Sequence, residues 1–369
     1  MQMCEAFAQQ PNISLRLYTA RRRNTPELAA VQDIWAYYGV TPNFEIKRLA
    51  CLDFIGLLPA WITFVLQMAT YMVTLGFTLH FQRADLYYSR DQFTLLMLSL
   101  FVPKESLCYE THQLSSSRWQ GHCVRRVGTV VAITGALADR MRALGAHHVI
   151  IEHDGFRTAR FANPVDQMTA RRQLNMSASA FVVGYVGRLH TMGMDKGLGN
   201  VIEAIAQQSL TALKPLTLCL VGGPDDQANV LKQQWILRGL APELFIYSGT
   251  VNANQVPIYL AAFDVCLMPQ PWTEHFAYYT SALKLFEYMA AERAILATNL
   301  PGTAEVVRDQ ESAFFTPPGD PEAMAKALQR LANDPALRQR LAAQAKRDVA
   351  DYAWDRRAMR ILQAIFEPV

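Results

Sequence analysis

A regular alternation of short apolar runs with helical patterns constrains the fold of this chain more than any other feature. In the second half apolar runs occur at residues 180–187, 216–223, 244–249, 265–269 and 294–298, and the first four of them end in glycine or proline. Helical patterns separate them, at residues 199–208, 226–239, 254–262, 281–290 and from 302. Strands that alternate with helices are typical of a parallel, doubly wound sheet of the α/β class.

The first half shows the same kind of pattern. Apolar runs occur at residues 14–19, 84–89, 106–111, 129–134 and 147–155, with helical segments between them. Residues 156–178 are polar and loop-like, and they predict the junction between two domains. Since 369 residues suit two cores better than one, we predict a Rossmann-like domain over residues 1–165 and a second over 166–350. A C-terminal helix within 351–369 is expected to return to the first domain.

Charge and cysteine usage exclude several classes of protein. Residues 1–175 hold 18 Lys and Arg against 13 Asp and Glu, which suits a phosphate-rich partner or an anionic membrane face. Nucleic acid is not an expected partner, because no Lys/Arg cluster is interleaved with aromatic residues. The six cysteines lack any Cys-x-x-Cys and any paired spacing with histidine, so we expect free thiols and no metal site. No signal peptide is visible, which favours a cytoplasmic protein.

Residues 54–81 form a run without a formal charge. By length alone this run could span a bilayer. It contains Pro59, Gln67 and His80, however, and no second run of this kind accompanies it. Three interpretations stay open: a buried or membrane-leaning helix of the first domain, a true membrane span, and an ordinary core segment.

The stretch SALKLFEYMA, residues 281–290, predicts a helix with Ser281 as its N-cap. Its apolar residues share one face and are expected to pack on a core: Leu283, Phe286, Met289 and Ala290. Lys284 and Glu287 are three positions apart and lie beside that face, where they form either a surface ion pair or part of a site. Ligands of doubly wound sheets bind where strand ends meet helix N-termini. Gly187 and Gly222, which follow two of the strands, are expected at that edge.

Three segments together resemble the retaining glycosyltransferases of the GT-B fold: GYVGRLHTMGMDKGLGNVIEA, YETHQL and SALKLFEYMA. More narrowly they are similar to the large family of sucrose synthase-like and lipid-mannosyl enzymes, glycosyltransferase family 4, in its Ser-Pro-Leu-Lys subgroup. The resemblance implies two Rossmann-like domains that face each other across a cleft. It also implies that Arg188 and Lys196 grip the donor diphosphate, that Glu287 holds the ribose, and that His112 faces the transferred sugar.

The resemblance further implies that Ser281, Ala282 and Leu283 offer backbone N–H groups to the donor phosphate, with Lys284 adding charge. Three departures from the family pattern stand out. The first of the family's two glutamates is replaced by Tyr279, and Ala282 stands where proline is usual. The opening residues, MQMCEAFAQQPNISLRLYTA, match the pattern only from the helix that follows the family's first strand and glycine-rich loop.

The sequence therefore predicts a retaining hexosyltransferase that uses a nucleotide-sugar donor, either UDP- or GDP-linked, and needs no cofactor and no metal. Its acceptor is a glycan, a lipid-linked molecule or a small molecule, and the first domain is expected to contact the inner face of a membrane. A catalytically silent GT-B partner subunit is the alternative, supported by the missing first glutamate and the missing N-terminal loop. A GT-B nucleotide-sugar epimerase is favoured less, because its catalytic carboxylates have no counterpart here.

Overall fold

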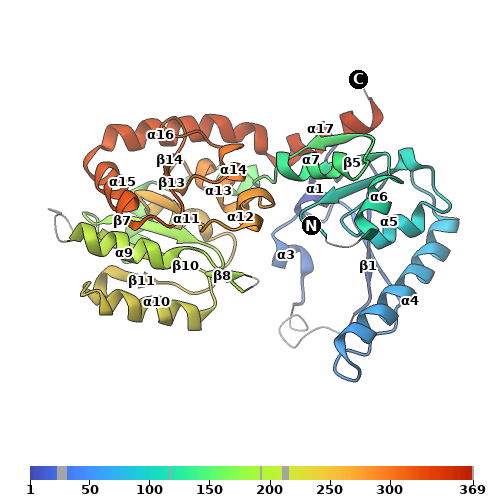
Figure 1. Ribbon diagram of the computed structural model, residues 1–369, viewed down its shortest axis with the longest axis horizontal. Helices are drawn as coiled ribbons and strands as arrows, with labels where there is room; N and C mark the ends of the chain where they lie inside the picture. Colours follow the sequence, from blue (N-terminus) through green and yellow to red (C-terminus); the bar gives the residue numbers. More distant parts are fainter. Residues whose placement is uncertain (23–30, 116–117, 192, 210–215, 368–369) are drawn as a thin grey trace. The chain divides into compact units, whose positions relative to one another are not determined.

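The computed structural model describes residues 1–22, 31–115, 118–191, 193–209 and 216–367, and the chain divides into two compact units. Unit 1 comprises Met1–Ile133, Leu137–Glu152 and Trp354–Val369. Unit 2 comprises Thr134–Ala136 and His153–Ala353. Each unit is built around a parallel sheet, as the alternating pattern predicts (Figure 1).

Unit 2 contains a six-stranded parallel sheet with the strand order β11-β10-β7-β12-β13-β14. Its strands are β7 (Phe181–Val186), β10 (Leu216–Val221), β11 (Phe245–Tyr247), β12 (Val265–Met268), β13 (Ala294–Thr298) and β14 (Phe314–Thr316). A short antiparallel hairpin of β8 (His190–Thr191) and β9 (Met194–Asp195) follows β7. The apolar runs of the second half are therefore strands, and the prediction of a doubly wound sheet is confirmed.

Helices cover both faces of this sheet. Val183 and Tyr185 of β7 pack into one core cluster, whereas Val182 and Val186 pack into the other, because successive side chains of a strand point to opposite faces. Strands buried on both faces read as continuous apolar runs, which explains the sequence pattern. The helices are α8 (Gln167–Gln173), α9 (Leu198–Ser209), α10 (Asp225–Leu237), α11 (Val256–Ala262), α12 (Glu274–Tyr278), α13 (Leu283–Ala290), α14 (Pro301–Ala304), α15 (Pro321–Asn333) and α16 (Pro335–Asp348). Short 3₁₀ turns are η2 (Thr158–Phe161), η3 (Pro242–Leu244) and η4 (Val349–Tyr352).

Unit 1 carries two parallel sheets among its described residues. One has the order β3-β4-β5-β6, and the other pairs β1 with β2. The strands are β1 (Arg16–Ala20), β2 (Glu45–Leu49), β3 (Tyr87–Ser89), β4 (Leu107–Thr111), β5 (Thr129–Ala132) and β6 (Val149–Ile151). The helices are α1 (Gln2–Ala8), α3 (Ile34–Tyr38), α4 (Ala60–Phe81), α5 (Gln92–Leu98), α6 (Arg118–Val124), α7 (Gly135–Ala143) and α17 (Trp354–Phe366), with a 3₁₀ turn η1 (Lys104–Ser106).

The terminal helix α17 belongs to unit 1. Its Trp354, Ala358 and Ile361 share a buried cluster with Met3 and Phe7 of α1. The last helix of the chain thus completes the core around the first one.

Residues 156–178 are not the loop that their polar composition predicts. They contain η2 and α8, and Phe161 and Ala170 are buried in unit 2. Arg171 is buried as well, and its Nη2 lies 2.6 Å from Oδ2 of Asp264. Arg160, Gln167 and Arg171 thus bond to distant partners inside the fold instead of being solvated. The structure accordingly divides the chain at Glu152 and His153, earlier than the predicted boundary at 165.

Helix α4 contains most of the uncharged run at 54–81. Only four of its residues are buried: Thr63, Gln67, Leu75 and Leu79. The interpretation of this run as an ordinary core segment is therefore wrong. Of the described helices, α4 alone is long and apolar enough to cross a membrane, by length and composition.

Candidate functional site

Two glycines bring strand ends of unit 2 into direct backbone contact. The N–H of Gly187, after β7, donates to the carbonyl of Val221 at 2.8 Å. The N–H of Gly222, after β10, donates to the carbonyl of Gly249 at 2.6 Å. A Cβ atom on Gly222 would lie 2.1 Å from the carbonyl oxygen of Gly187. The carboxyl ends of these strands therefore form a tight, side-chain-free edge, as expected where a ligand approaches the backbone.

Helix α13 begins beside this edge, one residue later than predicted. Its N-cap is Ala282, which has no side chain to bond the first N–H groups of the helix. The hydroxyl of Ser281 instead accepts a hydrogen bond from the N–H of Asp154 at 2.8 Å. The prediction of Ser281 as N-cap is thus wrong, because a distant segment uses its hydroxyl. A helix start without a side-chain cap favours an anion.

The apolar stripe of α13 is only partly as predicted. Phe286, Met289 and Ala290 are buried in the core of unit 2. Leu283 is 48% exposed, so it does not belong to the core face. Its position in the first turn leaves its side chain outside the packed part of the helix.

Lys284 points from α13 toward the end of β7. Its Nζ lies 3.7 Å from the ring centroid of Tyr185 and hydrogen-bonds to the hydroxyl of that residue. A Cβ atom on Gly187 would lie 3.1 Å from the same Nζ. Burial holds the pKa of Lys284 well below its ordinary value, repulsion from Lys196 lowers it further, and Glu287 offsets part of this.

Lys196 follows β9 and is also buried, with 8% of its surface exposed. Its Nζ lies 4.3 Å from the ring centroid of Phe276 in α12. Burial lowers the pKa of Lys196, and the nearby Asp195 counteracts the shift only in part. Among the described residues, neither Lys196 nor Lys284 has a carboxylate within ion-pair distance. The two ammonium groups therefore repel each other, and the nearby carboxylates offset this only from beyond ion-pair distance.

Glu287 lies one turn further along α13 and is paired. Its Oε1 is 2.9 Å from Nη1 of Arg160 in η2, and the two side chains are 20% and 9% exposed. Burial raises the pKa of Glu287, and Arg160 and Lys284 reduce the shift. Glu287 therefore belongs to the same charged cluster as the lysines.

Replacing Arg160 with methionine is expected to lower the free energy of unfolding by about 2 kcal/mol, because it leaves a largely buried carboxylate without its cation. The double variant Arg160→Met/Glu287→Gln should lose less than Arg160→Met alone, since no charge is then unpaired. Chemical denaturation of the wild type, both single variants and the double variant measures this. Strictly additive losses would show that the pair is not coupled.

The remaining predicted residues lie in different surroundings. Arg188 is exposed, and its backbone carbonyl accepts a hydrogen bond from the Tyr185 hydroxyl at 2.8 Å. Its predicted grip on the diphosphate stays a prediction. His112 belongs to unit 1, where its ring bonds to the buried carboxylate of Glu110. Its contact with the transferred sugar also stays a prediction.

Glu110, the partner of His112, is buried at the centre of a charged cluster in unit 1. Nη1 of Arg357 lies 3.2 Å from Glu110, and Nη2 of Arg90 lies 2.6 Å from it. Burial acts to raise the pKa of Glu110, but Arg357 and His112 outweigh it and hold the pKa below its ordinary value. His112 is thus oriented by a carboxylate that stays ionised.

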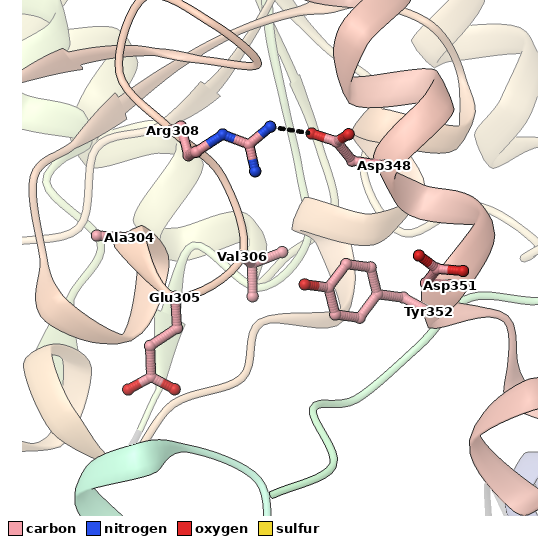
Figure 2. A pocket seen from close by; sticks show the side chains of 7 residues that line it. All are labelled: Ala304, Glu305, Val306, Arg308, Asp348, Asp351 and Tyr352. Carbon is pink, nitrogen blue, oxygen red and sulfur yellow. Dashed lines mark hydrogen bonds and ion pairs between the residues drawn. The ribbon is translucent and has the colours of Figure 1, made fainter. Parts of the chain in front are cut away.

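Figure 2 shows a separate pocket of unit 2, of about 270 Å³. Its lining residues come from the α14 region and from the end of α16: Ala304, Glu305, Val306, Arg308, Asp348, Asp351 and Tyr352. Nη2 of Arg308 is tied to Asp348 at 3.3 Å. Three carboxylates against one paired cation do not suit a diphosphate, so this pocket is not the donor site.

Sequence reasoning missed three residues that shape the site. Tyr185 and Phe276 contact the two lysines through their rings, yet each stands in a run that reads as ordinary core. Arg160 pairs with Glu287 across 127 positions of sequence, and no local signal marks it. The basic residues of 157–160 are the only hint that the sequence offers.

Comparison with known proteins agrees with this geometry. Residues 180–334 match the family model described as "Glycosyl transferases group 1". The chain is 28% identical over 255 residues to "D-inositol 3-phosphate glycosyltransferase" of Salinispora arenicola, covering 66% of this chain and 55% of that protein. The chain thus spans about half the length of curated relatives it matches.

Solved structures show the same fold. Sucrose-phosphate synthase from Thermosynechococcus elongatus superimposes with a TM-score of 0.77 at 19% identity, over 99% of this chain and 91% of that one. HepE from Anabaena, solved in complex with UDP, gives a TM-score of 0.68 at 21% identity, over 88% and 87% of the two chains. The architecture of two Rossmann-like units is therefore that of the GT-B fold, as predicted.

Proposed function

Since the chain carries a group 1 glycosyltransferase domain in a GT-B fold, we propose that it is a retaining hexosyltransferase. It moves a hexose from a nucleoside-diphosphate sugar to an acceptor, which is a glycan, a lipid-linked molecule or a small molecule. The donor binds unit 2 at the carboxyl edge of its sheet. UDP and GDP are the candidate nucleotides.

One observation carries the proposal: Lys196 and Lys284 are desolvated and have no carboxylate partner among the described residues. Placing two lysines in this way is unfavourable unless an anion joins them. A diphosphate gains negative charge as the bond to the sugar breaks, and preorganised cations stabilise that charge. The glycine edge at Gly187 and Gly222 and the uncapped start of α13 admit the phosphates to the backbone.

The other residues have supporting roles in this proposal. Glu287 accepts hydrogen bonds from the ribose hydroxyls, and Arg160 keeps its carboxylate oriented. Arg188 adds a third cation to the diphosphate from the loop after β7. Retention follows from the family resemblance, with the leaving phosphate helping to deprotonate the acceptor on the same face. The two lysines neutralise the leaving group, so the reaction needs no essential metal.

A silent partner subunit is the second candidate, because Tyr279 replaces the family's first glutamate. The two candidates differ in nucleotide binding, which can be measured. The transferase must bind a nucleotide, whereas a silent subunit has no need to bind one.

Thermal unfolding with UDP, GDP and ADP tests the proposal. One of the three is expected to stabilise the protein by about 2.7 kcal/mol when present at about 100 times its Kd. The same gain is expected with a chelator present, since no metal is invoked. Glu287→Ala and Arg188→Ala should reduce it, because they remove the ribose acceptor and one phosphate cation.

Arg340→Ala is the matched control, because Arg340 is an exposed arginine of α16 in the same unit. It should leave the nucleotide effect unchanged. Absence of any stabilisation by all three nucleotides would favour the silent subunit. Loss of the effect with chelator would overturn the metal-free mechanism while leaving nucleotide binding intact.

A further inference from the structure

The carboxylate of Glu110 lies inside unit 1, directly beside the ring of His112. Glu110 is in β4 and His112 follows the end of that strand, so the two side chains, two positions apart, share one face. Nε2 of His112 contacts Oε1 of Glu110. The side chain of Glu110 is fully buried, whereas that of His112 is 28% exposed. The ring thus rests on the interior of the unit by one nitrogen and keeps part of its surface accessible.

Two arginines hold Glu110 as an anion. Nη1 of Arg357 lies 3.2 Å from Oε2 of Glu110, and Nη2 of Arg90 lies 2.6 Å from Oε1. An ionised carboxylate accepts hydrogen bonds and cannot donate one. The bond to His112 therefore requires a proton on Nε2 of the ring. In a neutral imidazole with its proton on Nε2, the other nitrogen, Nδ1, is a hydrogen-bond acceptor.

The support behind Glu110 comes from the last helix of the chain. Arg357 of α17 is itself fully buried, and its Nη2 donates to the carbonyl of Glu152 at 3.0 Å. A buried ion pair of this kind is a poor source of stability, because well-packed apolar side chains of similar size would serve as well or better. A carboxylate at this position is explained if it has a second task. The arginines are protonated in any case, so what the carboxylate decides is the position of the proton on His112.

We propose that Glu110 is a positioning residue that keeps the proton of His112 on Nε2 and leaves Nδ1 as the acceptor for a hydroxyl group of the transferred sugar. A ring nitrogen without a proton accepts a hydrogen bond from a hydroxyl group but repels a phosphate oxygen, so it distinguishes the sugar from the diphosphate. Arg357 acts on His112 only through Glu110. The inference rests on the proposed function, because that function supplies the sugar.

Nitrogen-15 NMR of the histidine-labelled full chain tests the position of the proton. Spectra are recorded at about pH 8, above the ordinary pKa of histidine. The ring of His112, identified by its absence from the spectrum of His112→Gln, should carry its proton on Nε2. Glu110→Gln should allow both tautomers, because a side-chain amide can donate to a ring nitrogen as well as accept from one. A wild-type ring protonated on Nδ1, or a tautomer ratio that Glu110→Gln leaves unchanged, would overturn the proposal.

Release of nucleotide from UDP-glucose and GDP-glucose, measured without an acceptor, tests the consequence for the sugar. Glu110→Gln and His112→Gln should each lower kcat for release by about tenfold, as expected for the loss of one hydrogen bond. The double variant should lose no more than the single ones, because Glu110 acts only through His112. The Kd for UDP or GDP should stay unchanged, since the proposed nucleotide site lies in unit 2.

Glu105→Gln is the matched control, because Glu105 is an exposed glutamate of unit 1 close to the start of β4. It should change neither the spectrum of His112 nor the rate of release. Circular dichroism checks the fold of every variant, and the wild-type spectrum decides the position of the proton even if Glu110→Gln does not fold. Release by Glu110→Gln at the wild-type rate would show that Glu110 is structural and overturn this inference alone. A wild type that neither binds nor releases nucleotide would overturn the proposed function, and the sugar contact with it.

Discussion

Replacing Lys284 with methionine is expected to weaken nucleoside-diphosphate binding by about 30-fold, since a charge-assisted bond to phosphate is lost. The same change should raise the free energy of unfolding of the ligand-free protein by about 1 kcal/mol, because a desolvated cation gives way to an apolar chain of similar length. The Tyr185 hydroxyl keeps a partner in the carbonyl of Arg188. Titration calorimetry and thermal unfolding measure the two effects, which have opposite signs.

The pH dependence gives a second signature of Lys284. Its pKa in the folded protein is well below the ordinary value of 10.5, so the unfolded chain holds more protons between the two values. Ligand-free stability should therefore rise as pH rises through that window. Nucleotide affinity should fall over the same window, because the phosphate binds the protonated lysine. Lys284→Met should make both slopes shallower, and the remainder comes from Lys196, whose pKa burial also lowers.

Lys326→Met is the control for Lys284. Lys326 is an exposed lysine of α15 in the same unit, and its side chain is 73% exposed in an ion pair with Glu322. It should change neither nucleotide affinity nor the pH dependence. If Lys284→Met bound nucleotide as tightly as the wild type, Lys284 would be a structural residue that contacts only Tyr185.

Gly222→Ala is expected to lower the free energy of unfolding by about 4 kcal/mol, the sum of backbone strain and a steric clash. Gly222 has a φ of +121°, and a Cβ atom there would lie 2.1 Å from the carbonyl oxygen of Gly187. The oxygen belongs to backbone that is itself hydrogen-bonded to β10, so it cannot move alone. Nucleotide binding should be lost together with stability. Chemical denaturation and thermal unfolding give the measurement.

Gly239→Ala separates strain from clash. Gly239 also has a positive φ, of +72°, but a Cβ atom there would meet nothing within 4 Å. Its replacement should cost about 1 kcal/mol, from strain alone. Equal losses for the two variants would show that the close approach of the two strand ends contributes nothing.

The sheet of unit 2 could be predicted from sequence because its strands are buried on both faces. Burial forces runs such as residues 180–187 and 216–223 to be apolar throughout, and that pattern is visible without any knowledge of contacts. The two lysines and the glutamate of the site could be identified from sequence for a different reason. Lys196 and Lys284 stand at strand and helix boundaries, where apolar patterning stops, and Glu287 is a charged residue within an apolar helix.

Other features could not be predicted, because they depend on contacts between distant segments. Ser281 satisfies a local capping rule, yet its hydroxyl bonds to Asp154. Residues 156–178 look solvated, although Arg171 is buried and paired with Asp264. The polar content of a segment reveals a loop only when its polar groups face water. Here the side chain of Arg171 faces a partner that lies 93 positions away in the chain.

The packing of α17 on α1 has a consequence for the order in which the protein is made. Trp354, Ala358 and Ile361 complete a buried cluster with the first helix, and Arg357 neutralises the buried Glu110. These residues leave the ribosome only after every residue of unit 2 has done so. Unit 2 is therefore ready to fold during synthesis, while the cluster around α1 must wait for the last helix of the chain. Unit 1, most of which is synthesised first, is therefore the unit that completes its folding last.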